Sequence, residues 1–161
     1  MEYNAISQNT SFEIKAGSQI LGKLTYGNWF KFNAEMEIAG EKYDVEPKGF
    51  WKKNIEIKND AEIIADIKMN WDGDLIIRMK SSGKEEEFVL KHSGFFKEKF
   101  ILTNDQNEDL LIFKASYRWV DMIYNYHITS SENFEAIPGK TLLLFITLYA
   151  ANYFMWISAS I

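Results

Sequence analysis

The chain has 161 residues and a formal net charge of −5, with 18 Lys and Arg residues against 23 Asp and Glu residues. This length fits a single domain, and the acidic balance argues against a dedicated nucleic-acid-binding protein, which would carry a basic excess. Hydrophobic residues make up 47% and aromatic residues 16%, which excludes disorder over most of the chain. The absence of Cys excludes disulfides, thiol nucleophiles and Cys-based zinc sites, and two His residues leave little material for a His-rich metal site.

Residues 1–10 are polar and contain no apolar core segment, so they do not form a secretory signal. We expect them to form a polar N-terminal tail, followed by a single domain over residues 11–161. The absence of a signal favours a cytoplasmic location. Association with a membrane stays open because of the apolar C-terminal segment described below.

Apolar and polar residues alternate repeatedly between Phe12 and Ile128, which predicts half-buried β-strands. In the clearest example, apolar side chains share one face and polar side chains the other: Phe30, Phe32, Ala34, Met36 and Ile38 against Lys31, Asn33, Glu35 and Glu37. Turn signals such as Ala39-Gly40 and Asp72-Gly73 separate these segments. The pattern predicts an antiparallel meander of about ten to twelve strands over residues 11–130.

The chain also contains an internal repeat. Gly49-Phe50-Trp51-Lys52 reappears 45 residues later as Gly94-Phe95-Phe96-Lys97. A shorter similarity occurs three times, at residues 23–26, 68–71 and 114–117. We interpret the chain as two related β-meanders plus a partial third, and such duplication favours a closed barrel because closure removes exposed strand edges.

Residues 141–161 contain no charged residue, no Gly and no Pro. As a helix they would span about 30 Å, enough either for a membrane anchor or for a helix buried on all sides. A barrel of about twelve strands is too wide for its own side chains to fill. We therefore predict a mainly β protein, a closed antiparallel barrel of about twelve strands around a buried hydrophobic C-terminal α-helix at about residues 140–161. A tail anchor, and a helix lying across the sheet or pairing with another chain, are the alternatives.

Two features of the sequence resemble known proteins. Tyr124-Asn125-Tyr126-His127-Ile128, followed by Ser131-Glu132-Asn133-Phe134 and Pro138, looks like the last strand and the helix entry of phospholipid scramblases. The paired Gly-Phe-aromatic-Lys turns are similar to repeats of LURP-one-related proteins. Over Phe12 to Ile161 the chain resembles the tubby-like C-terminal superfamily, to which both groups belong.

The resemblance implies a twelve-stranded barrel wrapped around a hydrophobic C-terminal helix, with internal duplication. The chain departs from scramblases because it lacks their Cys cluster and Pro-rich arm, and its pre-helix loop holds fewer carboxylates than their calcium loop. Scrambling activity is therefore not carried over. The basic phosphoinositide pocket of tubby proteins has no counterpart that we can place in this sequence.

No catalytic constellation stands out in the sequence. We read His92 and His127 as strand histidines, and Asp72-Gly73-Asp74 as a hairpin turn. The acidic segment at residues 105–109 fails as a calcium loop because Leu110 stands where a Gly is required and Ser116 where a Glu is required. We expect a protein that is not an enzyme and has no cofactor and no metal site.

The candidate binding residues combine aromatic rings with cations in the two repeated turns. Such turns can sit at a bilayer interface or hold an anionic headgroup; alternatively, the rings plug the end of the barrel and the lysines face water. The residues are Phe50, Trp51, Lys52, Lys53, Phe95, Phe96, Lys97 and Lys99.

The sequence thus predicts a monomeric, non-enzymatic binding or scaffold module whose partner is an anionic lipid or a membrane surface, and not a nucleic acid. Two alternatives stay open. One is a tail-anchored membrane protein with an exposed β-domain, and the other is a hydrophobic-ligand carrier with the helix as a lid.

Overall fold

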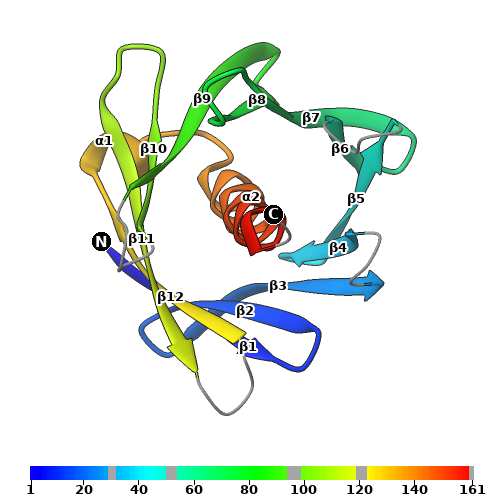
Figure 1. The fold of residues 1–161 in the computed structure, drawn as a ribbon. Coiled ribbons are helices and arrows are strands. Elements are labelled where there is room, and N and C mark those ends of the chain that lie inside the picture. The colour runs from blue at the N-terminus through cyan, green and yellow to red at the C-terminus, as the bar shows by residue number, and fades with distance from the viewer. Residues whose placement is uncertain (29–31, 50–53, 94–98, 119–122, 160–161) are drawn as a thin grey trace.

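The computed structural model describes residues 1–28, 32–49, 54–93, 99–118 and 123–159. Twelve strands form a closed antiparallel barrel around a C-terminal helix, and the strands follow one another in chain order until β1 pairs with β12 (Figure 1). The strands are β1 (Glu2–Gln8), β2 (Ser11–Ala16), β3 (Gln19–Asn28), β4 (Asn33–Ile38), β5 (Glu41–Lys48), β6 (Asn54–Asn59), β7 (Glu62–Met69), β8 (Leu75–Ser81), β9 (Lys84–Ser93), β10 (Lys99–Thr103), β11 (Asp109–Arg118) and β12 (Ile123–Ser130). The fold predicted from the sequence is therefore confirmed.

Alternating burial explains why these segments form strands around a filled interior. In β4, Ala34, Met36 and Ile38 are buried while the residues between them are exposed. Met36 lies opposite Leu24 of β3 and Tyr43 of β5, so neighbouring strands bring apolar side chains to the same face. Repeated around the barrel, this alternation gives an interior surface that is mainly apolar.

The prediction of a polar tail over residues 1–10 is wrong. Residues 2–8 form β1, which pairs with both β12 and β2 and closes the barrel. Tyr3 and Ala5 point inward and are buried, and so is the hydroxyl-bearing Ser7. The side-chain oxygen of Asn125 accepts hydrogen bonds from the Ser7 backbone N–H at 2.9 Å and from its hydroxyl at 3.1 Å, which offsets the cost of burying these groups.

The internal repeat is visible in the pairing of the strands. The register shifts by one residue in three equivalent hairpins, β2–β3, β6–β7 and β10–β11, so that Leu21, Ile64 and Leu110 are the extra residues. A further shift, at Gly27 in the β3–β4 pair, does not belong to this repeat. The three equivalent hairpins are four strands apart, and the three similar segments near residues 23, 68 and 114 lie on their second strands, β3, β7 and β11. Because a bulge increases local twist, three evenly spaced bulges help the sheet close.

Helix α2 (Lys140–Ala159) runs through the middle of the barrel (Figure 1). Every residue from Leu143 to Ala151 is buried, as expected for a helix that is apolar all round. By length and composition alone its segment from Lys140 to Ser158, with a mean hydropathy of 1.4, could also cross a membrane. A short helix, α1 (Glu132–Glu135), connects β12 to α2 and is capped by the Ser131 side chain, which accepts a hydrogen bond from the Phe134 N–H.

The path of the chain places different connections, and different ends of α2, at the two ends of the barrel. We call the end where α2 begins the entry end; it holds the connections at residues 17–18, 39–40, 60–61, 82–83 and 104–108. We call the end where α2 finishes the exit end; β1, β3, β5, β7, β9 and β11 all finish there. The contact of Trp156 with Phe32, which lies between β3 and β4, places the last turns of α2 at the exit end.

Candidate functional site

Most of the predicted site lies outside the described residues. This applies to Phe50, Trp51, Lys52 and Lys53, and likewise to Phe95, Phe96 and Lys97. Lys99 is described: it is the first residue of β10, is half-buried and pairs with Ser93 and Lys114. The strand ends on either side of both segments, at residues 48, 54, 93 and 99, belong to the exit end. The two aromatic–Lys segments therefore join strands at the same end of the barrel.

Aromatic rings pack around the last turns of α2 at this end. Tyr149 stacks on Tyr26 with ring centroids 5.8 Å apart and on Tyr153 at 6.4 Å. Phe32 meets Tyr153 at 5.5 Å and Trp156 at 4.3 Å, and its carbonyl oxygen accepts a 2.7 Å hydrogen bond from the Tyr149 hydroxyl. Burial raises the pKa of Tyr149 and of Tyr153, so these phenols stay neutral. Together these contacts attach the connection after β3 to the end of the helix.

Asn152 is the polar residue that fixes the rotation of α2 inside the barrel. The Tyr126 hydroxyl donates to its side-chain oxygen at 2.8 Å, and its amide nitrogen donates to the Tyr26 hydroxyl at 3.2 Å. Tyr26 belongs to β3 and Tyr126 to β12, so one side chain links the helix to two strands that are not neighbours. Such a pair of partly buried hydrogen bonds is satisfied in only one orientation of the helix. We therefore assign Asn152 the role of holding α2 in this orientation inside the barrel.

The two histidines occupy the strand positions that were predicted for them. His92, near the end of β9, is half-buried and stacks on Phe154 with ring centroids 4.7 Å apart. His127 lies on the outer face of β12, with Nδ1 3.2 Å from the side-chain oxygen of Asn4 and Nε2 3.4 Å from the carboxylate of Glu2. His92 therefore contributes to aromatic packing, and His127 makes polar contacts on the surface of the barrel.

Trp71 stands fully exposed at the exit end, in the connection between β7 and β8. The loop is well ordered because the Asn70 side-chain oxygen accepts from the backbone N–H groups of Asp72 at 3.0 Å and Asp74 at 2.9 Å. Gly73 adopts a φ of +83°, a left-handed conformation that favours glycine. The turn predicted at residues 72–74 is confirmed, and it presents an indole ring to solvent.

The entry end contains an acidic cleft. A surface cleft of about 660 Å³ lies between the start of β9 and the β10–β11 connection, and its carboxylates come from Glu85, Glu86, Glu87, Asp105 and Glu108. The Glu108 carboxylate accepts from the amides of Asn104 at 2.8 Å and Asn133 at 3.2 Å. Within the described ranges, no three His, Asp or Glu side chains gather closely enough to hold a metal ion.

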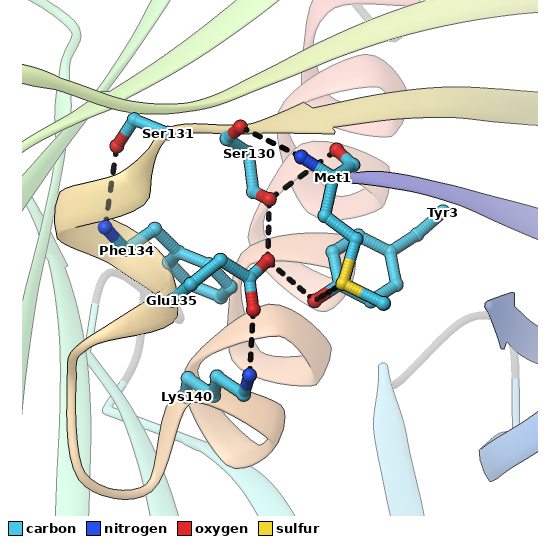
Figure 2. A network of polar contacts seen from close by, with 7 residues as sticks. All are labelled: Met1, Tyr3, Ser130, Ser131, Phe134, Glu135 and Lys140. Carbon is cyan, nitrogen blue, oxygen red and sulfur yellow. Dashed lines mark hydrogen bonds and ion pairs between the residues drawn. The ribbon is translucent and has the colours of Figure 1, made fainter.

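A polar network at the entry end ties the seam of the barrel to the start of α2 (Figure 2). The Glu135 carboxylate accepts hydrogen bonds from the hydroxyls of Tyr3, at 2.6 Å, and Ser130, while Lys140 Nζ lies 2.6 Å from its other oxygen. Tyr3 belongs to β1 and Ser130 to β12, the two strands that close the barrel. The amino group of Met1 also donates to the Ser130 carbonyl at 3.2 Å. Glu135 therefore links β1, β12 and the start of α2.

The ionisation of Glu135 is expected to contribute to stability. Burial on its own would raise the pKa of this carboxyl, but hydrogen bonds from Lys140, Ser130 and Tyr3 and the charge of Lys140 lower it below the ordinary value. A depressed pKa stabilises the folded state at pH values above the unfolded-state pKa, and this stabilisation is lost as the pH falls through the lowered pKa of the folded state.

Glu135→Gln is expected to lower the free energy of unfolding at neutral pH by about 2 kcal/mol, the usual scale for hydrogen bonds to a charged group. Urea unfolding at neutral and acidic pH measures this, and the loss should shrink as the pH falls. Glu132→Gln is the matched control, because Glu132 is also in α1 but exposed, and its effect should stay within about 0.5 kcal/mol. Equal unfolding midpoints for Glu135→Gln and the unaltered chain at neutral pH would contradict the stabilising role of the ionised Glu135 carboxylate.

Comparison with known proteins identifies no relative: no family model, no curated protein and no solved structure matches this chain. Function is therefore inferred from the residues and their arrangement.

Proposed function

We propose that this protein is a non-enzymatic binding module that docks the exit end of its barrel on an anionic membrane surface. The observation that carries the proposal is that one end of the barrel holds the strand ends flanking the aromatic–Lys segments, the exposed Trp71 and the last turns of α2. Aromatic rings beside cations are the residues found where proteins meet lipid headgroups. A cytoplasmic location and membership of the tubby-like superfamily belong to the same proposal, and the barrel around a hydrophobic helix supports that membership.

The distribution of charged residues supports an approach in which the exit end faces the membrane. Lys68 and Lys91 are exposed near the exit end, and Lys99 is half-buried there. The segments outside the described residues add further lysines between strands that finish at this end, at positions 31, 52, 53 and 97. The acidic cleft lies at the opposite end. An anionic surface would attract the first end and repel the second, so the molecule would approach with the exit end leading.

The two alternative functions have less support. A hydrophobic-ligand carrier needs a volume inside the barrel for its ligand, and the buried side chains of α2 fill the middle of this barrel. A tail anchor would need α2 outside the barrel, where its contacts with Tyr26, Phe32 and Tyr126 would be lost. We therefore propose docking without a membrane-spanning segment.

Charge reversal in the aromatic–Lys segments tests the proposal. Replacing four lysines by Glu should reduce binding to phosphatidylcholine vesicles that contain phosphatidylserine by more than about a hundredfold, since each Lys near such a surface contributes about 1 kcal/mol. The changes are Lys52→Glu, Lys53→Glu, Lys97→Glu and Lys99→Glu. Vesicle sedimentation measures the binding, which should also weaken as salt is added.

The control reverses the same number of charges away from the exit end, with Lys23→Glu, Lys42→Glu, Lys80→Glu and Lys84→Glu. The control variant should bind the vesicles much more strongly than the first variant, because only lysines close to the membrane are attracted by its negative surface potential. The proposal fails if the unaltered chain does not sediment with these vesicles, or if both variants lose binding equally.

A further inference from the structure

We infer that the exit end inserts an apolar foot, formed by Trp71 and the last turn of α2, into the interfacial layer of the bilayer. This inference rests on the proposed function and deepens it, because it adds a non-electrostatic contact that does not depend on the lysines. The barrel would thus be held at the membrane by two separable contributions, headgroup attraction and shallow insertion without a spanning helix.

Trp71 carries the first part of the inference. Packing within the barrel does not explain this residue, because its side chain is fully exposed. The side chain of Asn70 and the turn at Gly73 fix the loop beneath it, with backbone hydrogen bonds from Asn70 N–H to the Asp74 carbonyl at 2.9 Å and from Gly73 N–H to the Asn70 carbonyl at 3.2 Å. An indole held on an ordered loop loses little conformational entropy on binding. Its apolar body and N–H group suit the level of the lipid headgroups.

The last turn of α2 carries the second part. Burial along the helix decreases toward its C-terminal end: Tyr153 is 5% exposed, whereas Trp156 is 40% exposed. Phe154, Met155 and Ile157 are only partly buried against the core. The helix therefore presents apolar side chains at the rim of the barrel, at the same end as Trp71.

The surrounding charges separate this contact from the attraction of the lysines. Asp72 is exposed and Asp74 half-buried next to Trp71, so an anionic headgroup is not attracted to this loop by charge. The contribution of the Trp71 loop to membrane binding must therefore come from removing the indole ring from water. Lysines elsewhere at this end, Lys68 and Lys91 among them, supply the charge complementarity that selects a lipid surface as the occupant.

Trp71→Ser tests the inference on the full chain, using phosphatidylcholine vesicles that contain phosphatidylserine. We expect the partition coefficient to fall about tenfold, because burying even a third of a Trp side chain at about 25 cal/mol per Å² has this effect. The dependence of binding on salt should keep its slope, since no charge changes. Brominated phosphatidylcholine in the same vesicles should quench the tryptophan fluorescence of the unaltered chain, and quench the Trp71→Ser chain less.

Ile20→Ser is the matched control: Ile20 is 55% exposed at the entry end, so this change should leave vesicle binding as it was. Thermal unfolding of Trp71→Ser should match that of the unaltered chain, because the removed side chain lies in solvent. Unchanged partitioning and quenching in Trp71→Ser, with binding still lost on lysine reversal, would overturn the insertion and leave the proposed function standing. Absence of vesicle binding by the unaltered chain would overturn both.

Discussion

A chain that ends at Lys140 is expected to lose its cooperative unfolding transition and to aggregate, because it lacks the apolar side chains that fill the barrel. Leu143, Leu144, Phe145, Ile146, Leu148 and Tyr149 are each at most 1% exposed. At about 1.5–3 kcal/mol for each large buried side chain, their removal would cost roughly 10 kcal/mol or more, comparable to the whole stability of a domain. The strands would retain an apolar interior face with nothing to cover it. Solubility and thermal unfolding without detergent measure the outcome.

A chain that ends at Ser158 is the control for this truncation. It keeps every buried residue of α2 and should unfold at nearly the same temperature as the full chain. A soluble, cooperatively folding chain that ends at Lys140 would show that the strands do not need the helix as their core.

Gly22→Ala is expected to destabilise the fold by about 3 kcal/mol or more, because β3 passes too close to its neighbours at this residue. A Cβ atom on Gly22 would lie 2.4 Å from the carbonyl oxygen of Glu37 and 3.0 Å from the ring of Phe145. The first neighbour is backbone of the paired strand β4 and cannot move without disturbing the ladder. The second is a ring of α2 with no exposed surface. Urea unfolding measures the loss.

Gly27→Ala in the same strand is the matched control, since the nearest atom to its Cβ would be the Asn33 carbonyl oxygen at 4.0 Å. Its effect should stay within about 0.5 kcal/mol. Equal shifts of the unfolding midpoint for the two glycines would mean that the close approach at Gly22 is not what requires a glycine there.

The alternation of apolar residues predicted most of the barrel because one face of each strand is buried. It failed for β1, where the buried side chains are Tyr3, Ala5 and the polar Ser7. Ser7 can be buried only because Asn125, 118 residues away, accepts its hydrogen bonds. Such a partnership between the two ends of the chain has no signal within a short window of sequence. The helix could be predicted because a barrel of this width requires an apolar filling.

The three equivalent bulges at Leu21, Ile64 and Leu110 have a sequence signal that the alternation of apolar and polar residues alone does not reveal. Each bulge sits where two apolar residues follow one another and break the alternation, as at Ile20-Leu21 and Ile63-Ile64. Taken singly, such a pair predicts nothing definite. Its recurrence four strands later, together with the repeat of residues 23–26, would have indicated three equivalent hairpins.

The candidate site could be predicted only in part. The repeat singled out the two aromatic–Lys segments, and strand topology brings their flanking strand ends together. Trp71 lies in the repeated segment 68–71, but neither the repeat nor the composition predicts that its side chain is exposed. The Glu135 network escaped prediction because its contact with Tyr3, 132 residues away, forms only when the barrel closes.

We expect α2 to be the core of the barrel and the exit end to be the surface that meets lipid. Hydrogen exchange of the full chain without detergent, followed with and without phosphatidylserine-containing vesicles, tests this expectation most directly. The amides from Leu143 to Ala151 should exchange among the slowest in both conditions, and vesicles should add protection around residues 70–74 and 154–158. Rapid exchange in α2 without vesicles, replaced by protection of the whole helix when vesicles are present, would contradict this expectation and identify α2 as a membrane segment.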